Sequence, residues 1–174
     1  STSLNPRQRI GQLLDAPLRL NTSLEPAERE QRINQTLRQV GMLPDHAFYY
    51  PHMLASGQKQ RVALARALIL QPKVIVADEA LASLDMSMRS QIINLMLELQ
   101  EKHGISYIYV TQHLGMMKHI SDQVLVMHEG EIVERGSTAE VLAAPLHELT
   151  KRLIASHFGE ALTADAWRRD GGRF

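Results

Sequence analysis

Apolar residues recur with a helical period early in the chain. Ile33, Leu37 and Val40 are four and three positions apart within residues 27–40, which places their side chains on one face of a helix. Gly41 follows directly, and glycine commonly ends a helix at such a position. We therefore predict that the N-terminal part of the chain forms a small layer of helices without chemistry of its own.

From residue 54 onward, segments of helical period alternate with short apolar runs. Helices are predicted at residues 56–68, 87–102 and 114–120, and strands at residues 73–77, 105–110, 123–127 and 131–134. The run at 73–77 has no polar alternation, which is typical of a strand buried on both faces of a parallel sheet. Glu129 and Gly130 indicate a tight turn, so we expect the last two strands to form a hairpin. This order of elements predicts an α/β fold.

The composition is that of an ordinary globular protein with balanced charge. Of the 174 residues, 44% are hydrophobic, and 19 Lys and Arg residues offset 19 Asp and Glu residues. This balance argues against a nucleic-acid-binding module, which usually carries a clustered basic excess. Because the sequence contains no cysteine, a disulfide scaffold, a thiolate metal site and a cysteine nucleophile are excluded. No apolar run reaches the roughly 20 residues that a membrane-spanning helix needs.

Polar and acidic residues follow two of the predicted strands. Asp78 and Glu79 end the first strand, and Thr111-Gln112-His113 end the second. In an open parallel sheet, reactive groups collect at the carboxyl ends of strands. One carboxylate there can hold Mg²⁺ while the next orients or deprotonates a water, and a nearby histidine can reach the same water. Taken alone, these residues are equally compatible with the start of a loop and a solvated histidine.

A helix start lies just before the acidic strand. Small residues and exposed backbone N–H groups at a helix N-terminus form a natural phosphate-binding site, and the segment Leu54-Ala55-Ser56-Gly57-Gln58 has this character. After the acidic pair comes Ser83-Leu84-Asp85.

These motifs, in this order, resemble the ATP-binding subunits of ABC transporters. The signature segment (residues 54–58), the acidic strand (74–79), residues 83–85 and His113 each correspond to a family motif. The resemblance implies a P-loop NTPase (RecA-like) ABC ATPase core, of which this chain is the C-terminal half with part of the helical subdomain. It also implies three parts: residues 1–53, a part of the helical subdomain that contacts the permease; residues 54–143, the ATPase core; and residues 144–174, a C-terminal extension.

The resemblance also implies roles for individual residues and two cofactors, ATP and Mg²⁺. Asp78 is expected to organise Mg²⁺, Glu79 to be the catalytic carboxylate, and His113 to be the catalytic switch histidine at the γ-phosphate. Asp85 is expected to cross a dimer interface. The ATP held by the partner subunit is expected to contact Ala55, Ser56, Gly57 and Gln58. Each ATP would then lie between two subunits.

Three further segments resemble the dipeptide and oligopeptide branch of the family: residues 3–7, 50–52 and 145–151. This branch implies a subunit that powers transport of peptides or related cationic small molecules. A polyamine exporter ATPase and a non-catalytic regulatory or assembly subunit remain alternatives. DNA-repair and chromosome-organising ATPases fit less well, because they normally carry long coiled coils or zinc modules, and the sequence has neither heptads nor cysteines. Expected partners are a sister ATPase in a heterodimer, two membrane permease subunits and a substrate-binding protein, with no nucleic acid, at the cytoplasmic face of the bacterial inner membrane.

Two departures from the family pattern matter. No glycine is followed by lysine, so the phosphate-binding P-loop is missing from the sequence, and we expect the 174 residues to be the C-terminal part of a longer subunit. We predict that this chain alone neither binds ATP tightly nor hydrolyses it. The signature segment reads Leu-Ala-Ser-Gly-Gln instead of Leu-Ser-Gly-Gly-Gln, with Ala55 and Ser56 at the altered positions. We expect this change to weaken the site that holds the partner's ATP.

Overall fold

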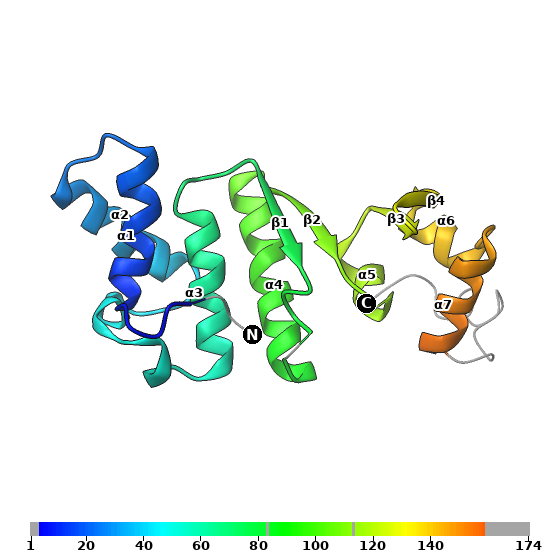
Figure 1. Cartoon of the computed structure of the whole chain (residues 1–174), viewed down its shortest axis with the longest axis horizontal. Helices are drawn as coiled ribbons and strands as arrows, with labels where there is room; N and C mark the ends of the chain where they lie inside the picture. Colours follow the sequence, from blue (N-terminus) through cyan, green and yellow to red (C-terminus); the bar gives the residue numbers. More distant parts are fainter. Residues whose placement is uncertain (1–3, 83, 113, 159–174) are drawn as a thin grey trace. The chain divides into compact units, whose positions relative to one another are not determined.

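The computed structural model describes residues 4–82, 84–112 and 114–158 (Figure 1). The chain divides into two compact units, Ser1–Val110 and Thr111–Phe174. The division into three parts at residues 53 and 143, which the family resemblance implies, stays a prediction.

The elements follow the predicted order closely. The first unit contains α1 (Ile10–Asn21), α2 (Pro26–Gln39), the short 3-10 helices η1 (Pro44–Phe48) and η2 (Pro51–Met53), α3 (Ser56–Leu68), β1 (Val74–Asp78), α4 (Met86–His103) and β2 (Ser106–Val110). The second unit contains α5 (Leu114–Ile120), β3 (Gln123–His128), β4 (Glu131–Ser137), α6 (Thr138–Ala143) and α7 (Glu148–Phe158). Within the described residues, no helix is both long and apolar enough to cross a bilayer.

The predicted N-terminal layer of helices is confirmed. It includes α1, a helix that the sequence pattern did not identify individually. Leu14 and Leu18 of α1 are fully buried, as is Leu37 of α2, and the two helices pack through these apolar faces. Pro17 lies inside α1. A proline within a helix removes a backbone hydrogen bond, so the local sequence does not favour a continuous helix there.

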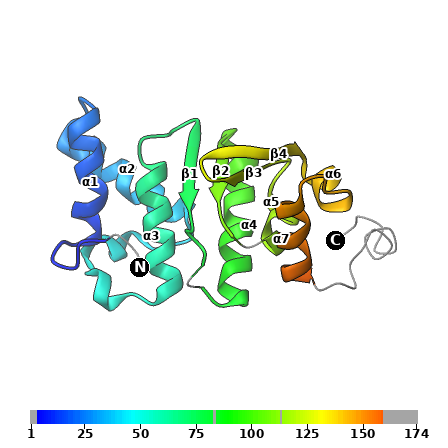
Figure 2. The same ribbon diagram turned by 45° about the vertical axis from the view of Figure 1, so that its right-hand side comes forward.

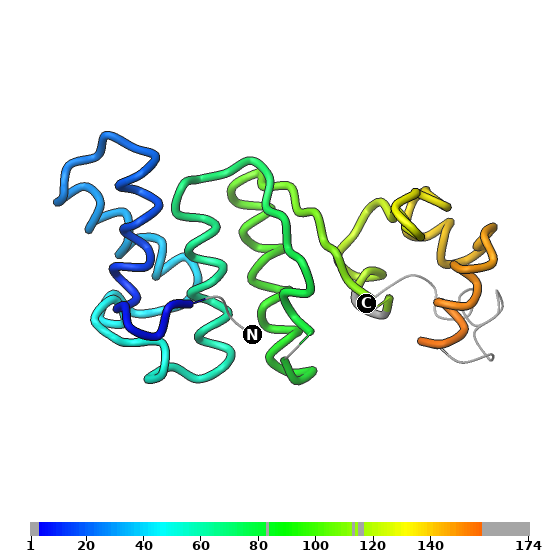
Figure 3. The backbone as a smooth tube through the Cα atoms, in the orientation of Figure 1, coloured from blue at the N-terminus to red at the C-terminus, as the bar shows by residue number. Residues whose placement is uncertain are grey.

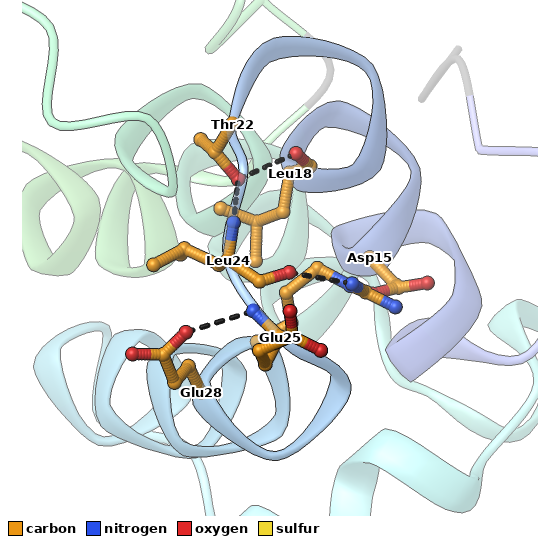
Figure 4. Close-up of polar contacts among 7 residues, drawn as sticks. Asp15, Leu18, Thr22, Leu24, Glu25 and Glu28 are labelled. Atoms are coloured by element: carbon orange, nitrogen blue, oxygen red, sulfur yellow. Dashed lines mark hydrogen bonds and ion pairs between the residues drawn. The ribbon is translucent and has the colours of Figure 1, made fainter.

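The turn that joins α1 to α2 is held by side-chain contacts (Figure 4). The Thr22 hydroxyl donates to the Leu18 carbonyl at 2.7 Å and accepts from the Leu24 N–H at 3.5 Å. Arg29 reaches back across the turn: its Nε pairs with Asp15 Oδ1 at 2.7 Å, and its Nη1 donates to the Leu24 carbonyl at 2.8 Å. These contacts fix the angle at which α2 returns along α1.

β1 and β2 form a two-stranded parallel sheet in the first unit. Its covered face packs on α3 and α4, which run side by side (Figures 1 and 3). Ile75 and Ala77 are buried on this face. On the other face Val76 is 64% exposed, and Ile108 and Val110 of β2 are more than half exposed. The prediction that the first strand is buried on both faces is therefore wrong within the first unit, where no described element covers the second face.

The second unit is built on an antiparallel hairpin of β3 and β4, as predicted (Figure 2). Glu129 and Gly130 form the turn with φ angles of 47° and 84°. In the described residues β3 pairs with β4 and not with the β1–β2 sheet, so the α/β pattern is split into two small sheets. Val124 and Val126 pack against Val141 of α6.

A buried glutamate connects this hairpin to α7. Glu134 of β4 keeps 9% of its surface exposed, and its two carboxylate oxygens accept the backbone N–H groups of Leu146 at 2.7 Å and His147 at 3.0 Å. Burial raises the pKa of Glu134, but the Leu146 N–H, the Thr150 side chain and the His147 N–H together outweigh burial, and the pKa lies below its ordinary value. The segment 145–151, which resembles a family element, thus serves here to dock the start of α7.

Candidate functional site

The acidic pair lies at the carboxyl end of β1, as predicted. Asp78 is the last residue of the strand and is exposed on the open face of the sheet. Glu79 follows in a left-handed backbone conformation with φ of 45°, which few non-glycine residues adopt. Its N–H donates to the Val110 carbonyl at 2.9 Å. This bond holds the acidic pair beside the end of β2.

A cavity of about 390 Å³ opens next to the acidic pair, between α3, β1 and α4. Asp78, Glu79, Ala80 and Gln60 are among the residues that line it. The Gln60 side-chain amide donates to the Ala80 carbonyl at 2.6 Å. Sequence reasoning did not single out Gln60. The sequence shows that Gln60 lies two residues after the signature segment, but its contact with the acidic loop depends on tertiary structure.

The signature segment forms the start of α3, as predicted. Ala55 occupies the N-cap position in an extended conformation, and no side chain caps this end of the helix. The Gln58 side chain folds back and accepts the Ala55 N–H at 3.0 Å. Alanine has no oxygen to offer the first-turn N–H groups, whereas serine at an N-cap accepts one of them. The N-cap residue therefore offers no side-chain acceptor to the first-turn N–H groups, which suits an external anion.

The signature segment meets the start of α4. A Cβ atom on Gly57 would lie 2.6 Å from Met88 Sδ, so a larger residue there would require the flexible Met88 side chain to shift. The Ser56 hydroxyl donates to the same sulfur at 3.8 Å. Asp85 is the N-cap of α4, and its carboxylate accepts the Met88 N–H at 2.9 Å. Met88 thus connects the signature segment to Asp85.

The predicted site residues fall into two clusters within the first unit. Asp78 and Glu79 border the cavity together with Gln60, and the signature segment lies with Asp85 around Met88. Both clusters touch the first two turns of α3. His113 lies outside the described residues. The roles that the resemblance assigns to these residues stay predictions.

The carboxylates of Asp78 and Glu79 suit the binding of Mg²⁺ and water in an Mg²⁺·ATP site. Mg²⁺ in phosphoryl-transfer sites is usually held by one or two carboxylates together with substrate phosphates and water. Asp78, exposed at a strand end, fits this requirement, although the described residues contain no cluster of three metal-ligating side chains. The sequence contains no Gly-Lys pair to bind the phosphates.

Comparison with known proteins places these observations in a family context. Residues 1–82 match the ABC transporter domain. Over 98% of its length, the chain is 82% identical to the putrescine export system ATP-binding protein SapF of Escherichia coli K12 and to the peptide transport system ATP-binding protein SapF of Salmonella typhimurium. The di/tripeptide transport ATP-binding protein DppF of Pseudomonas aeruginosa is 45% identical over 88% of the chain and is matched over 48% of its own length.

A solved structure shares the fold. It is the dimeric post-hydrolysis state of the ATP-binding cassette MJ0796 bound to ADP and Pi, which is similar with a TM-score of 0.66 and 26% identity. The match covers 79% of this chain and 60% of that one. The chain likewise spans 63% of the length of the two SapF proteins.

Proposed function

Since the chain belongs to the ABC transporter family, we propose that it forms part of an ATP-binding and ATP-hydrolysing subunit that powers transport of peptides or related cationic small molecules. The resemblance drawn from the sequence motifs and the P-loop NTPase fold class are both confirmed. The relatives SapF and DppF are named for peptide transport, which supports the substrate class.

The observation that carries the proposal is the placement of the acidic pair. Asp78 and Glu79 end a parallel strand beside the helix that begins with the signature segment, and one cavity borders both elements. A phosphoryl-transfer site requires carboxylates held in place by a rigid scaffold, and the end of β1 beside α3 supplies them.

The residues divide the work of hydrolysis between them. Asp78 holds Mg²⁺, which supplies charge neutralisation at the phosphates when bound. Glu79 orients the attacking water and accepts its proton, and His113 acts at the same phosphate. The N–H groups at the start of α3 face the nucleotide of the opposite subunit together with Asp85. The MJ0796 cassette is a dimer, which supports a shared site of this kind.

The subunit works in an assembly at the cytoplasmic face of the bacterial inner membrane. Its partners are a sister ATPase, two membrane permease subunits and a substrate-binding protein. Residues 1–53 belong to the part that contacts the permease. By itself the chain neither binds ATP tightly nor hydrolyses it, because its sequence has no Gly-Lys pair for the β- and γ-phosphates.

Two specific observations each favour another candidate function. The E. coli K12 relative is named for putrescine export, which favours a polyamine exporter as the second candidate. Ala55, an N-cap without a side-chain acceptor, favours a regulatory or assembly subunit as the third. Glu79 argues against the third candidate, because a subunit without catalysis has no need for a carboxylate at this strand end.

Turnover of Mg²⁺·ATP by the complete subunit with its partner ATPase tests the proposal. Glu79→Gln removes the proton acceptor while keeping the side-chain volume, and turnover should fall by about 100-fold or more. Glu101→Gln, an exposed change on α4, is the matched control and should leave turnover unchanged. Equal turnover by wild type and Glu79→Gln would assign hydrolysis to the partner's site and refute a catalytic role for this chain. Transport assays with labelled peptide and labelled putrescine separate the first two candidates.

A further inference from the structure

The backbone at Glu79 is held in a conformation that it would not adopt by itself. Its φ of 45° lies in the left-handed region, where a side chain crowds the following carbonyl. Such a residue keeps this conformation only when the surrounding structure determines it. The contacts around Glu79 therefore decide where its carboxylate is presented.

Three hydrogen bonds hold the backbone around Glu79. The Glu79 N–H donates to Val110 at 2.9 Å, and the Glu79 carbonyl accepts from the Ala82 N–H at 3.2 Å. The third comes from another helix: Gln60 of α3 donates from its side chain to the Ala80 carbonyl at 2.6 Å. Of these three bonds, the one from Gln60 can be removed by a side-chain substitution.

Packing holds this loop on one side only. Leu81 is buried, with 3% of its surface exposed, but Glu79, Ala80 and Leu81 also line the cavity of about 390 Å³, together with Gln60. A loop next to a cavity of this size has room to shift when a hydrogen bond that fixes it is lost. Gln60 therefore adds a directional constraint to the packing of Leu81.

We propose that Gln60 is a positioning residue for Glu79, acting through the Ala80 carbonyl. Gln60 lies one turn after Ser56 on the same helix, so it also ties the acidic loop to the signature segment. A displacement at the start of α3 is transmitted to the peptide that follows Glu79. The catalytic consequence rests on the proposed function, whereas the positioning of the backbone does not.

The test compares Gln60→Met with wild type. Methionine has a similar length and a high helix propensity but no N–H donor, so packing is kept while the hydrogen bond is lost. Gln91→Met, an exposed change on α4, is the matched control. Gln60→Asn keeps an amide donor but is one methylene shorter, and it serves as the second variant if Gln60→Met fails to fold.

Amide hydrogen exchange of the full 174-residue chain gives the first readout. Exchange at the Glu79 and Ala82 amides should accelerate by about fivefold to tenfold, the size of one typical hydrogen bond. The amides of Leu95 and Leu99, buried in α4, should keep their wild-type rates. Equal acceleration at all four amides would mean a merely structural role, and no acceleration at Glu79 and Ala82 would mean no role. Either result would overturn the proposal.

Kinetics of the complete subunit with its partner ATPase give the second readout. A misplaced Glu79 should lower kcat and leave KM for ATP near the wild-type value, because the proposed effect of Gln60 acts through the Ala80 carbonyl on the chemical step. A raised KM with unchanged kcat would contradict positioning of Glu79. If the wild-type assembly shows no turnover, the proposed function fails, while the exchange experiment still decides the role of Gln60.

Discussion

Removing the Glu134 carboxylate should release α7 from the β3–β4 hairpin. Both carboxylate oxygens accept backbone N–H groups, from Leu146 at 2.7 Å and from His147 at 3.0 Å, in a nearly buried position. A hydrogen bond to a charged group contributes about 1.5 kcal/mol or more, so Glu134→Ala should lower the free energy of unfolding by about 3 kcal/mol. Glu134→Gln keeps one acceptor oxygen and places an NH₂ group against the other donor, so it should cost about half as much.

Urea unfolding followed by circular dichroism measures these differences. Glu131→Gln, an exposed change on the same strand, is the control and should stay within about 0.5 kcal/mol of wild type. A ranking in which Glu134→Gln equals Glu131→Gln would refute the reasoning, because it would mean that the two N–H groups do not depend on the charged carboxylate.

The same site predicts a pH dependence with a defined sign. The pKa of Glu134 is lowered in the folded state, because the polar contacts from Leu146, Thr150 and His147 outweigh burial. Its stabilisation is therefore complete above the unfolded pKa, about 4.3 for a glutamate, and is lost as pH falls through the lower folded pKa. The stability difference between wild type and Glu134→Gln should be full at pH 7 and should shrink below about pH 4. A difference that stays constant from pH 7 to pH 3 would contradict this assignment.

Two further predictions concern the start of α3. In the complete subunit, Ala55→Ser with Ser56→Gly should raise turnover at the partner's site, and Ala55→Ser by itself should stabilise the chain by about 1 kcal/mol through the missing N-cap; unchanged turnover and unchanged urea midpoints would refute these two effects. Gly57→Ala should stabilise a Met88→Ala background by about 0.5–1 kcal/mol, because alanine favours a helix, but should lose that gain in wild type, where its Cβ meets Met88 Sδ. Additive effects in a double-mutant cycle would disprove the close contact.

Secondary structure was largely predictable from the sequence, because local signals mark the element ends. The predicted bounds of α3 and α5 agree with the structure, and α4 ends where Gly104 adopts a φ of 64°. The helix α1 was not separated, because Pro17 opposes a helix locally, while burial of Leu14 and Leu18 stabilises it through tertiary packing. Tertiary packing thus determines the conformation of α1, where the local sequence signals conflict.

The sequence pattern could not predict that one face of the β1–β2 sheet is exposed. An unbroken run of β-branched residues indicates a strand whose two faces can both be packed against apolar elements. It does not show that such an element is present on each face. Val76 and Ile108 have the composition of a covered face and are exposed in the described part of the chain.

The sequence predicted which residues form the acidic pair and that they follow a strand. It did not predict the backbone conformation of Glu79 or the contacts around it. Asp78 and Glu79 were found from the rule that functional groups collect at strand ends. The left-handed φ of Glu79 and the contact from Gln60 depend on how α3 packs beside β1, which no local pattern encodes. Sequence motifs therefore located the acidic pair, and tertiary contacts determine the orientation of its backbone.

Asp85 shows how one residue can satisfy a structural role and a predicted functional role together. Its Oδ1 accepts the Met88 N–H and caps α4, although the family resemblance predicts that this acid reaches a partner subunit. A carboxylate has two oxygens and about four acceptor positions, so the cap uses a part of its capacity. Because the cap fixes the direction of the side chain, an approaching partner meets a carboxylate that is already ordered and loses little side-chain entropy on contact. The cap therefore supports the interface role instead of competing with it.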